Sequence, residues 1–194
     1  MARPRSISDQ MILHEAYELL MELGPNRFTF ERLGAQVGLV PAALVRRFKN
    51  KKQLILETDR YALQCTEEEV ERAISQAESP LKAIVAMFAA ELHFASTISR
   101  YANGQEILLM DFRDKELYDN YSTSFKRRHE RVIALLKKAQ ENGELRGIED
   151  FNELAYHLEM IQHGAGHVWA MAQKATIVDY IDRHITIALQ PYSK

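Results

Sequence analysis

The stretch TFERLGAQVGLVPAALVRRFKNKKQL, residues 29–54, contains two short helical patterns separated by a tight turn. The first pattern begins after Thr29, whose hydroxyl can cap a helix, and it ends at Gly38. Pro41 suits the first turn of the second helix, where a missing N–H costs nothing, and that helix runs to about Phe48. This arrangement predicts a helix-turn-helix, a motif whose second helix can enter the major groove of DNA.

The sequence on either side of this stretch predicts further helices. Before it, apolar residues from Ile12 to Leu23 share one helical face, and Gly24 followed by Pro25 ends the pattern. After it we expect helices over 51–70, from 80 to about 92, up to 108 after a break at 100–104, and over 117–140, 151–174 and 177–189. No segment alternates like a strand. The sequence therefore predicts an all-α protein of about nine helices, with an N-terminal three-helix helix-turn-helix domain and a C-terminal helical bundle.

The composition limits the class of protein. Hydrophobic residues make up 46% of the 194 residues and charged residues 27%, a balance that supports a packed core. The single cysteine, Cys65, excludes an internal disulfide framework. No signal peptide is evident, and no apolar run approaches the ~20 residues that a membrane span needs. We therefore expect a cytoplasmic protein that does not enter a membrane.

The charge is unevenly divided along the chain. Residues 1–56 carry a net charge of +4, whereas the whole chain carries −2, so residues 57–194 carry −6. A basic segment on an acidic body favours a polyanionic partner for the basic part. We predict a DNA-binding domain over 1–56 and a ligand-binding and dimerisation domain over 57–194.

Residues 38–54 also resemble the signature of the TetR family of transcriptional regulators. That signature runs Gly, Val, Ser, three variable residues, Leu, Tyr, a variable residue, His or Tyr, Phe, two variable residues, Lys, two variable residues and Leu. The chain matches it at Gly38, Leu44, Phe48, Lys51 and Leu54. Three of its departures matter, where it has Val40 for Ser, Val45 for Tyr and Arg47 for His or Tyr. The first departure removes a helix cap, and together they prevent any transfer of DNA sequence preference.

The motif and its surroundings predict the residues that would meet DNA. Small residues at the start of the second helix allow close approach to base edges, and a thymine methyl suits Ala42 or Ala43. Arg47 and Lys51 suit phosphates. An N-terminal arm could reach the minor groove, with solvated tail charges as the alternative. The complete predicted set is Arg3, Arg5, Thr29, Val40, Pro41, Ala42, Ala43, Arg46, Arg47 and Lys51.

The resemblance implies a ligand pocket and a homodimer in the C-terminal part. Aromatic side chains in its helices could line a pocket for an apolar or aromatic ligand, although plain core packing also explains them; the candidates are Phe88, Glu91, Phe112, Tyr121 and Trp169. The run Gly164, Ala165 and Gly166 would allow a second helix to approach closely in the dimer, with a local kink as the alternative. His163 and His167 are spaced for a metal, but no acidic partner accompanies them, so we predict no metal, no cofactor and no catalytic residue.

These observations favour a sequence-specific transcriptional regulator that binds double-stranded DNA, acts as a repressor, and is released by a small apolar ligand. The alternative is an all-helical binding protein or enzyme in which the helix-turn-helix is only structural. The positive charge of residues 1–56 favours the regulator, since a structural module has no reason to collect it. A second alternative is a regulator that senses no small molecule and responds to a protein partner or to no signal at all, and a filled C-terminal core would favour it.

Overall fold

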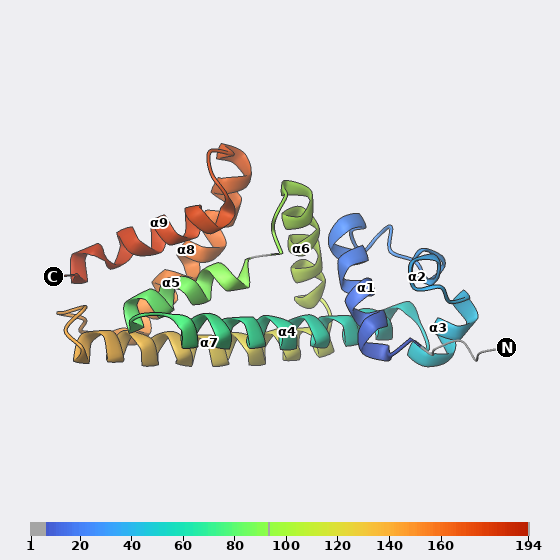
Figure 1. Ribbon diagram of the computed structural model, residues 1–194, viewed down its shortest axis with the longest axis horizontal. Helices are drawn as coiled ribbons and strands as arrows, with labels where there is room; N and C mark the ends of the chain where they lie inside the picture. The colour runs from blue at the N-terminus through green and yellow to red at the C-terminus, as the bar shows by residue number, and fades with distance from the viewer. Residues whose placement is uncertain (1–6, 93, 194) are drawn as a thin grey trace. The chain divides into compact units, whose positions relative to one another are not determined.

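The computed structural model describes residues 7–92 and 94–193, and these residues fold into helices (Figure 1). The helices are α1 Asp9–Leu23, α2 Phe30–Val37, α3 Pro41–Phe48, α4 Lys51–Gln76, α5 Pro80–Glu91, α6 Ile98–Asp111, α7 Lys115–Glu141, α8 Phe151–Ala172 and α9 Ile177–Leu189, followed by the short 3-10 turn η1 Gln190–Tyr192. The described residues contain no strand, only an isolated bridge between Leu145 and Ser193. The predicted all-α class is confirmed. None of the described helices combines the length and apolar character needed to cross a membrane.

The helices form two compact units. The first contains the described residues up to Cys65 together with 102–121, and the second contains residues 66–101 together with those from 122 onward. Three helices, α4, α6 and α7, contribute residues to both units. The domain boundary expected after residue 56 lies inside α4. The assignment of DNA binding to residues 1–56, and of ligand binding and dimerisation to residues 57–194, stays a prediction.

The first unit is built on α1 and the helix-turn-helix. Ser8 caps α1 by accepting a hydrogen bond from the Met11 N–H, and Gly24 ends the helix at a φ of 76°. The apolar face of α1 packs into a core with the side chains that point inward from α2, α3 and α4. Fully or almost fully buried members of this core are Ile12, Ala16, Phe28, Leu33, Leu44, Phe48 and Leu54.

The turn between α2 and α3 depends on two glycines. Gly38 ends α2 in the left-handed conformation, with a φ of 70°, which an L side chain adopts only with strain. Gly34 lies inside α2, and a Cβ at this position would collide with the carbonyl oxygen of Leu39. The Leu39 N–H in turn donates to the Gly34 carbonyl at 2.9 Å. The turn is therefore closed by backbone contacts that leave no room for a side chain at Gly34.

The second unit packs α9 against both α8 and α5, as Figure 1 shows. Asp150 caps α8, and Thr176 and Asp179 form a reciprocal capping box at the start of α9. The core collects buried side chains from α5, α7, α8 and α9, among them Ile84, Met87, Phe88, Val132, Leu136, Leu158, Ile181 and Ile185.

The predicted helix break at 100–104 is wrong, because α6 runs through it from Ile98 to Asp111. The interruption falls earlier, between the end of α5 at Glu91 and the start of α6. The hydroxyl of Thr97 accepts the Arg100 N–H at 3.2 Å and so caps α6. Asn103 donates its side-chain amide to the Met21 carbonyl at 2.8 Å, which keeps it from competing with the hydrogen bonds of its own helix.

Candidate functional site

Helix α3, the second helix of the helix-turn-helix, presents one face to the core and the opposite face to solvent. Leu44 and Phe48, four residues apart, bury the inner face. The outer face is small and apolar at its start and basic at its end. Its exposed residues are Val40, Ala42, Val45, Arg46 and Lys49, while Pro41 and Ala43 are half-buried. This face is therefore free to contact a partner.

Arg46 and Lys49 are the cations that this face offers. Both are exposed, and neither forms an ion pair or side-chain hydrogen bond with another residue in the described part of the chain. Lys49 was not among the predicted DNA contacts. It stands just after α3 in a positive-φ conformation, with a φ of 64°, and its place close to Arg46 in the sequence was the signal that could have found it.

Two of the predicted phosphate contacts are engaged inside the chain. Arg47 donates to the Ile7 carbonyl at 2.9 Å and pairs with Asp9 at 3.1 Å. The ammonium of Lys51 donates to the Pro25 carbonyl at 2.8 Å. These contacts join the start of α1 to α3, and the start of α4 to the turn after α1. Contact of either residue with phosphate stays a prediction.

Of the remaining predicted DNA contacts, the structure describes Thr29 and Val40. Thr29 is half-buried, and its hydroxyl accepts the Arg32 N–H at 3.3 Å, so it caps α2 as expected. Val40, at the start of α3, makes no side-chain cap, which agrees with the missing Ser. Arg3 and Arg5 lie outside the described residues.

The five candidate ligand contacts lie in different surroundings. Phe88 is fully buried in the core of the second unit, and Trp169 belongs to a smaller cluster, where its indole N–H donates to the Ala175 carbonyl at 2.9 Å. Phe112 and Tyr121 belong to the first unit and pack edge to face with ring centres 6.0 Å apart. Glu91 joins a polar network. The structure thus brings only Phe112 and Tyr121 together.

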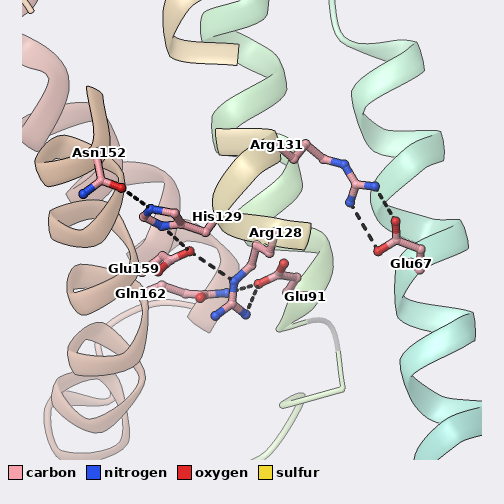
Figure 2. A network of polar contacts seen from close by, with 8 residues as sticks. All are labelled: Glu67, Glu91, Arg128, His129, Arg131, Asn152, Glu159 and Gln162. Atoms are coloured by element: carbon pink, nitrogen blue, oxygen red, sulfur yellow. Dashed lines mark hydrogen bonds and ion pairs between the residues drawn. The ribbon is translucent and has the colours of Figure 1, made fainter. Parts of the chain in front are cut away.

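The network around Glu91 is the most polar part of the second unit's interior (Figure 2). Glu91 accepts from Arg128 at 3.1 Å and from the Gln162 amide at 2.7 Å. Glu159 lies 3.6 Å from Arg128 and 3.5 Å from His129, whose other ring nitrogen is 2.9 Å from the Asn152 oxygen. Burial raises the pKa of Glu159, and the nearby Arg128 and His129 oppose this rise. One turn farther along α7, Arg131 forms a two-pronged ion pair with Glu67 of α4.

Only Glu91 of this network was a predicted site residue. The sequence did hold a signal for two of the others, because Glu159 and Gln162 each follow an apolar residue of α8 by four positions, Ala155 and Leu158. Polar side chains in an otherwise apolar helical stripe must find partners inside the protein or leave buried atoms unsatisfied.

The small residues of α8 take different positions. Gly164 is exposed, and a Cβ there would meet no atom within 4 Å, whereas a Cβ on the buried Gly166 would lie 2.7 Å from the Tyr101 ring. Gly166 is therefore needed for a contact within the chain, and Ala165 is buried as well. A dimer contact at these residues stays a prediction, with Gly164 as the member that faces solvent.

The two histidines that are spaced for a metal show another arrangement. His167 lies 2.9 Å from the Tyr101 hydroxyl through its Nδ1, so this atom already has a partner within the chain. Among the described residues, no group of three or more His, Cys, Asp or Glu side chains is arranged to hold a metal ion.

An exposed, basic second helix of a helix-turn-helix near the N-terminus, with a second helical unit beside it in the chain, is the arrangement typical of helix-turn-helix DNA-binding proteins. Residues 12–58 match the family model described as bacterial regulatory proteins of the tetR family. Residues 12–58 are therefore similar to the DNA-binding domain of the TetR family, and the described residues have the fold of TetR-family transcriptional regulators.

Solved structures agree with this fold. A transcriptional regulator from Saccharomonospora viridis, crystallised with choline, has a TM-score of 0.80 and 17% identity, over 92% of this chain and 93% of that one. PfmR from Thermus thermophilus has a TM-score of 0.69 and 19% identity, over 92% and 97%. FadR from Bacillus subtilis, in complex with stearoyl-CoA, has a TM-score of 0.71 and 16% identity, over 92% and 96%. No curated protein sequence matches the chain.

Proposed function

We propose that this chain is a transcriptional repressor that binds DNA through α3 and leaves it when a small molecule binds the second unit. The observation that carries the proposal is the outer face of α3. There, small residues and Arg46 are exposed together, on a helix whose position is set by the tight turn at Gly34 and Gly38. Such a helix can enter the major groove, and its arginine can reach a guanine edge or a phosphate.

A small ligand in the second unit would supply the switch. Two proteins of the same fold were crystallised with small molecules, choline in one and stearoyl-CoA in the other. We propose that the ligand of this chain is small and largely apolar, as the aromatic residues of its helices predict. The ligand would bind more tightly to the conformation that does not fit the operator than to the conformation that does, and the protein would then leave the DNA. Only such a difference in affinity shifts the equilibrium between two conformations.

Dimerisation through α8 and α9 is part of the same proposal. Tyr156, Met160 and Val168 are exposed on α8 at intervals of four or eight residues, and Gly164 completes the spacing. Met171 on α8 and both Val178 and Ile187 on α9 are exposed as well. An apolar helical stripe with a glycine at its centre suits a second helix at close range. A symmetric dimer would place two α3 helices about 34–36 Å apart, on a near-palindromic operator.

The test is selection of duplexes from a randomised pool with the full chain at 50 mM salt, followed by fluorescence anisotropy on the selected sequence. Arg46→Ala should weaken binding by about 10- to 100-fold, equivalent to the ~1–3 kcal/mol of one good base contact. The matched control is Arg146→Ala, which removes an exposed arginine from the second unit and should leave affinity unchanged.

Salt gives a second measure of the same interaction. With several phosphate contacts in each protomer, the affinity of the native protein should fall by roughly 10³-fold between 50 and 200 mM salt. Recovery of no duplex above background at low salt would exclude the proposed function.

A further inference from the structure

A pocket of about 450 Å³ opens in the first unit, where α6 ends and where α4 and α7 begin. Every residue that lines it belongs to the first unit. Three of these residues are apolar, Ile55, Met110 and Leu117, and only 5% of Ile55 and 4% of Leu117 is exposed. The volume lies within the range of small-molecule sites, whose walls are usually apolar with a few polar groups.

The charged side chains of the pocket are three cations and one carboxylate. Lys52 pairs with the carboxylate, Asp114, at 2.6 Å, and Glu116 lies 3.9 Å from the same ammonium group. Lys51 donates instead to the neutral Pro25 carbonyl at 2.8 Å. Among the described residues, no carboxylate lies within ion-pair distance of the Lys51 ammonium, so its positive charge is not balanced.

Arg113, the third cation, is the least engaged. It is exposed, and its guanidinium forms no ion pair or hydrogen bond with any residue that the structure describes. A guanidinium presents its N–H donors in a planar fork, which fits the two oxygens of a carboxylate. The N-terminal ends of α4 and α7, which carry partial positive charge, also lie at the pocket. The pocket therefore combines apolar walls with an excess of positive charge.

Other classes of small molecule match only part of this pocket. Lys51 and Arg113 would repel a cation, and a neutral apolar molecule would leave both positive charges without a counter-charge. A small inorganic anion would leave the apolar walls in contact with water.

We infer that the pocket binds an amphipathic organic anion, with a carboxylate on Arg113 beside Lys51 and an apolar part against Ile55, Met110 and Leu117. The inference goes beyond the proposed function, because it adds an anion site in the first unit, whereas the ligand proposed to release DNA occupies the second unit.

The test compares three probes with the same eight-carbon chain: octanoate, octan-1-ol and n-octylammonium. Each is titrated into the full-length protein by isothermal titration calorimetry, below the concentration at which the probe self-associates. Octanoate should bind about tenfold more tightly than octanol, because only octanoate forms a charge-assisted hydrogen bond with Arg113. Octylammonium should bind least, although the net charge of −2 on the whole chain favours cations. Butanoate should bind about tenfold or more weaker than octanoate, because its shorter chain covers less of the apolar walls.

Two variants of Arg113 locate the binding. Arg113→Gln removes the charge of an exposed side chain and should weaken octanoate about tenfold while leaving octanol unchanged. Arg113→Glu should reverse the preference, so that octylammonium binds more tightly than octanoate. Arg32→Gln is the matched control, because it removes an exposed arginine of the first unit that does not line the pocket. Circular dichroism shows whether each variant is folded.

Three results would overturn the inference. The native protein could bind octanoate no more tightly than octanol or butanoate, or octanoate affinity could stay unchanged in both folded Arg113 variants. An equal loss of octanoate affinity in Arg32→Gln would show that the anion does not bind at this pocket. None of these titrations contains DNA, so their outcome is independent of whether the proposed function holds.

Discussion

Asp59 and Asp111 bring two carboxylates into the packed part of the first unit. Asp111 is only 3% exposed, and its Oδ1 has no hydrogen-bond partner among the described residues. Burial raises the pKa of Asp111 to about 7, and the charges of Asp59 and Asp114 add to this rise. Burial also raises the pKa of Asp59 to about 6, against a weak opposing hydrogen bond from Asn120. The pair therefore costs stability when both carboxylates are ionised.

This arrangement predicts that the free energy of unfolding depends on pH. The pKa of Asp111 is higher in the folded state than in the unfolded state, so the folded state keeps a proton that the unfolded chain releases. Stability should then fall as pH rises from about 4 to about 7. Asp111→Asn should remove the part of this fall that comes from Asp111, leave the part that comes from Asp59, and stabilise the protein at pH 8 by on the order of 2 kcal/mol.

Urea unfolding at pH 5.5 and pH 8 measures both effects. Glu141→Gln is the control, because it neutralises an exposed carboxylate and should keep the pH dependence of the native protein. If Asp111→Asn retained the full difference between the two pH values, burial of this carboxylate would not be its source.

At the scale of the elements, the α2–α3 turn depends on backbone contact more than on side-chain packing. Gly34→Ala would drive a methyl group into the Leu39 carbonyl, and neither backbone segment can move without disturbing the turn. We expect a loss of about 2–3 kcal/mol in the free energy of unfolding. The affinity for DNA should fall as well, because α3 is held by this turn.

Gly38→Ala is the matched comparison in the same turn. A Cβ at Gly38 would meet no atom within 4 Å, so its only cost is the strain of a positive φ, roughly 1 kcal/mol. Denaturant unfolding of both variants should therefore rank Gly34→Ala as the more destabilising. The reverse order would show that the turn is less tightly closed than the contact of Gly34 with Leu39 indicates.

At the scale of the whole molecule, the proposed dimer can be tested through Gly164. No atom lies within 4 Å of a Cβ at this position, so Gly164→Leu fits a single chain and should even improve the helix propensity of α8. If α8 of a second copy packs there, the larger side chain separates the two chains. Size-exclusion chromatography with light scattering should then show monomers of 22.4 kDa for the variant and dimers for the native protein. DNA affinity should fall with the dimer.

Two controls distinguish this result from loss of folding. Ser75→Leu places the same side chain at an exposed position of α4 and should leave the dimer intact. Gly166→Leu is unsuitable, because Tyr101 occupies the space of its Cβ and the fold would suffer in any oligomeric state. Native protein that is monomeric at micromolar concentration, or a Gly164→Leu variant that stays dimeric, would contradict this interface.

The sequence by itself determined the elements whose signals are local. Thr29, Gly38 and Pro41 act on the backbone within a few residues of themselves, so the start and end of α2 and the start of α3 were predicted correctly. The same reason explains α9, which begins after the Thr176 cap and ends at Leu189 as predicted. The exposed face of α3 also followed from the sequence, because the burial of Leu44 and Phe48 determines which side chains point outward.

Only the tertiary structure decided which polar side chains form hydrogen bonds or ion pairs with distant parts of the chain. Gln162 and Glu91 are 71 residues apart, and Arg47 and Ile7 are 40 apart, so no local pattern could reveal that either pair is hydrogen-bonded. Asn103 of α6 likewise donates to the Met21 carbonyl, 82 residues away, a partner that the local sequence around residue 103 does not reveal. Helix caps and turns are short-range interactions that a sequence displays directly. Buried hydrogen bonds and ion pairs depend on how distant helices pack, and only the folded chain brings their partners together.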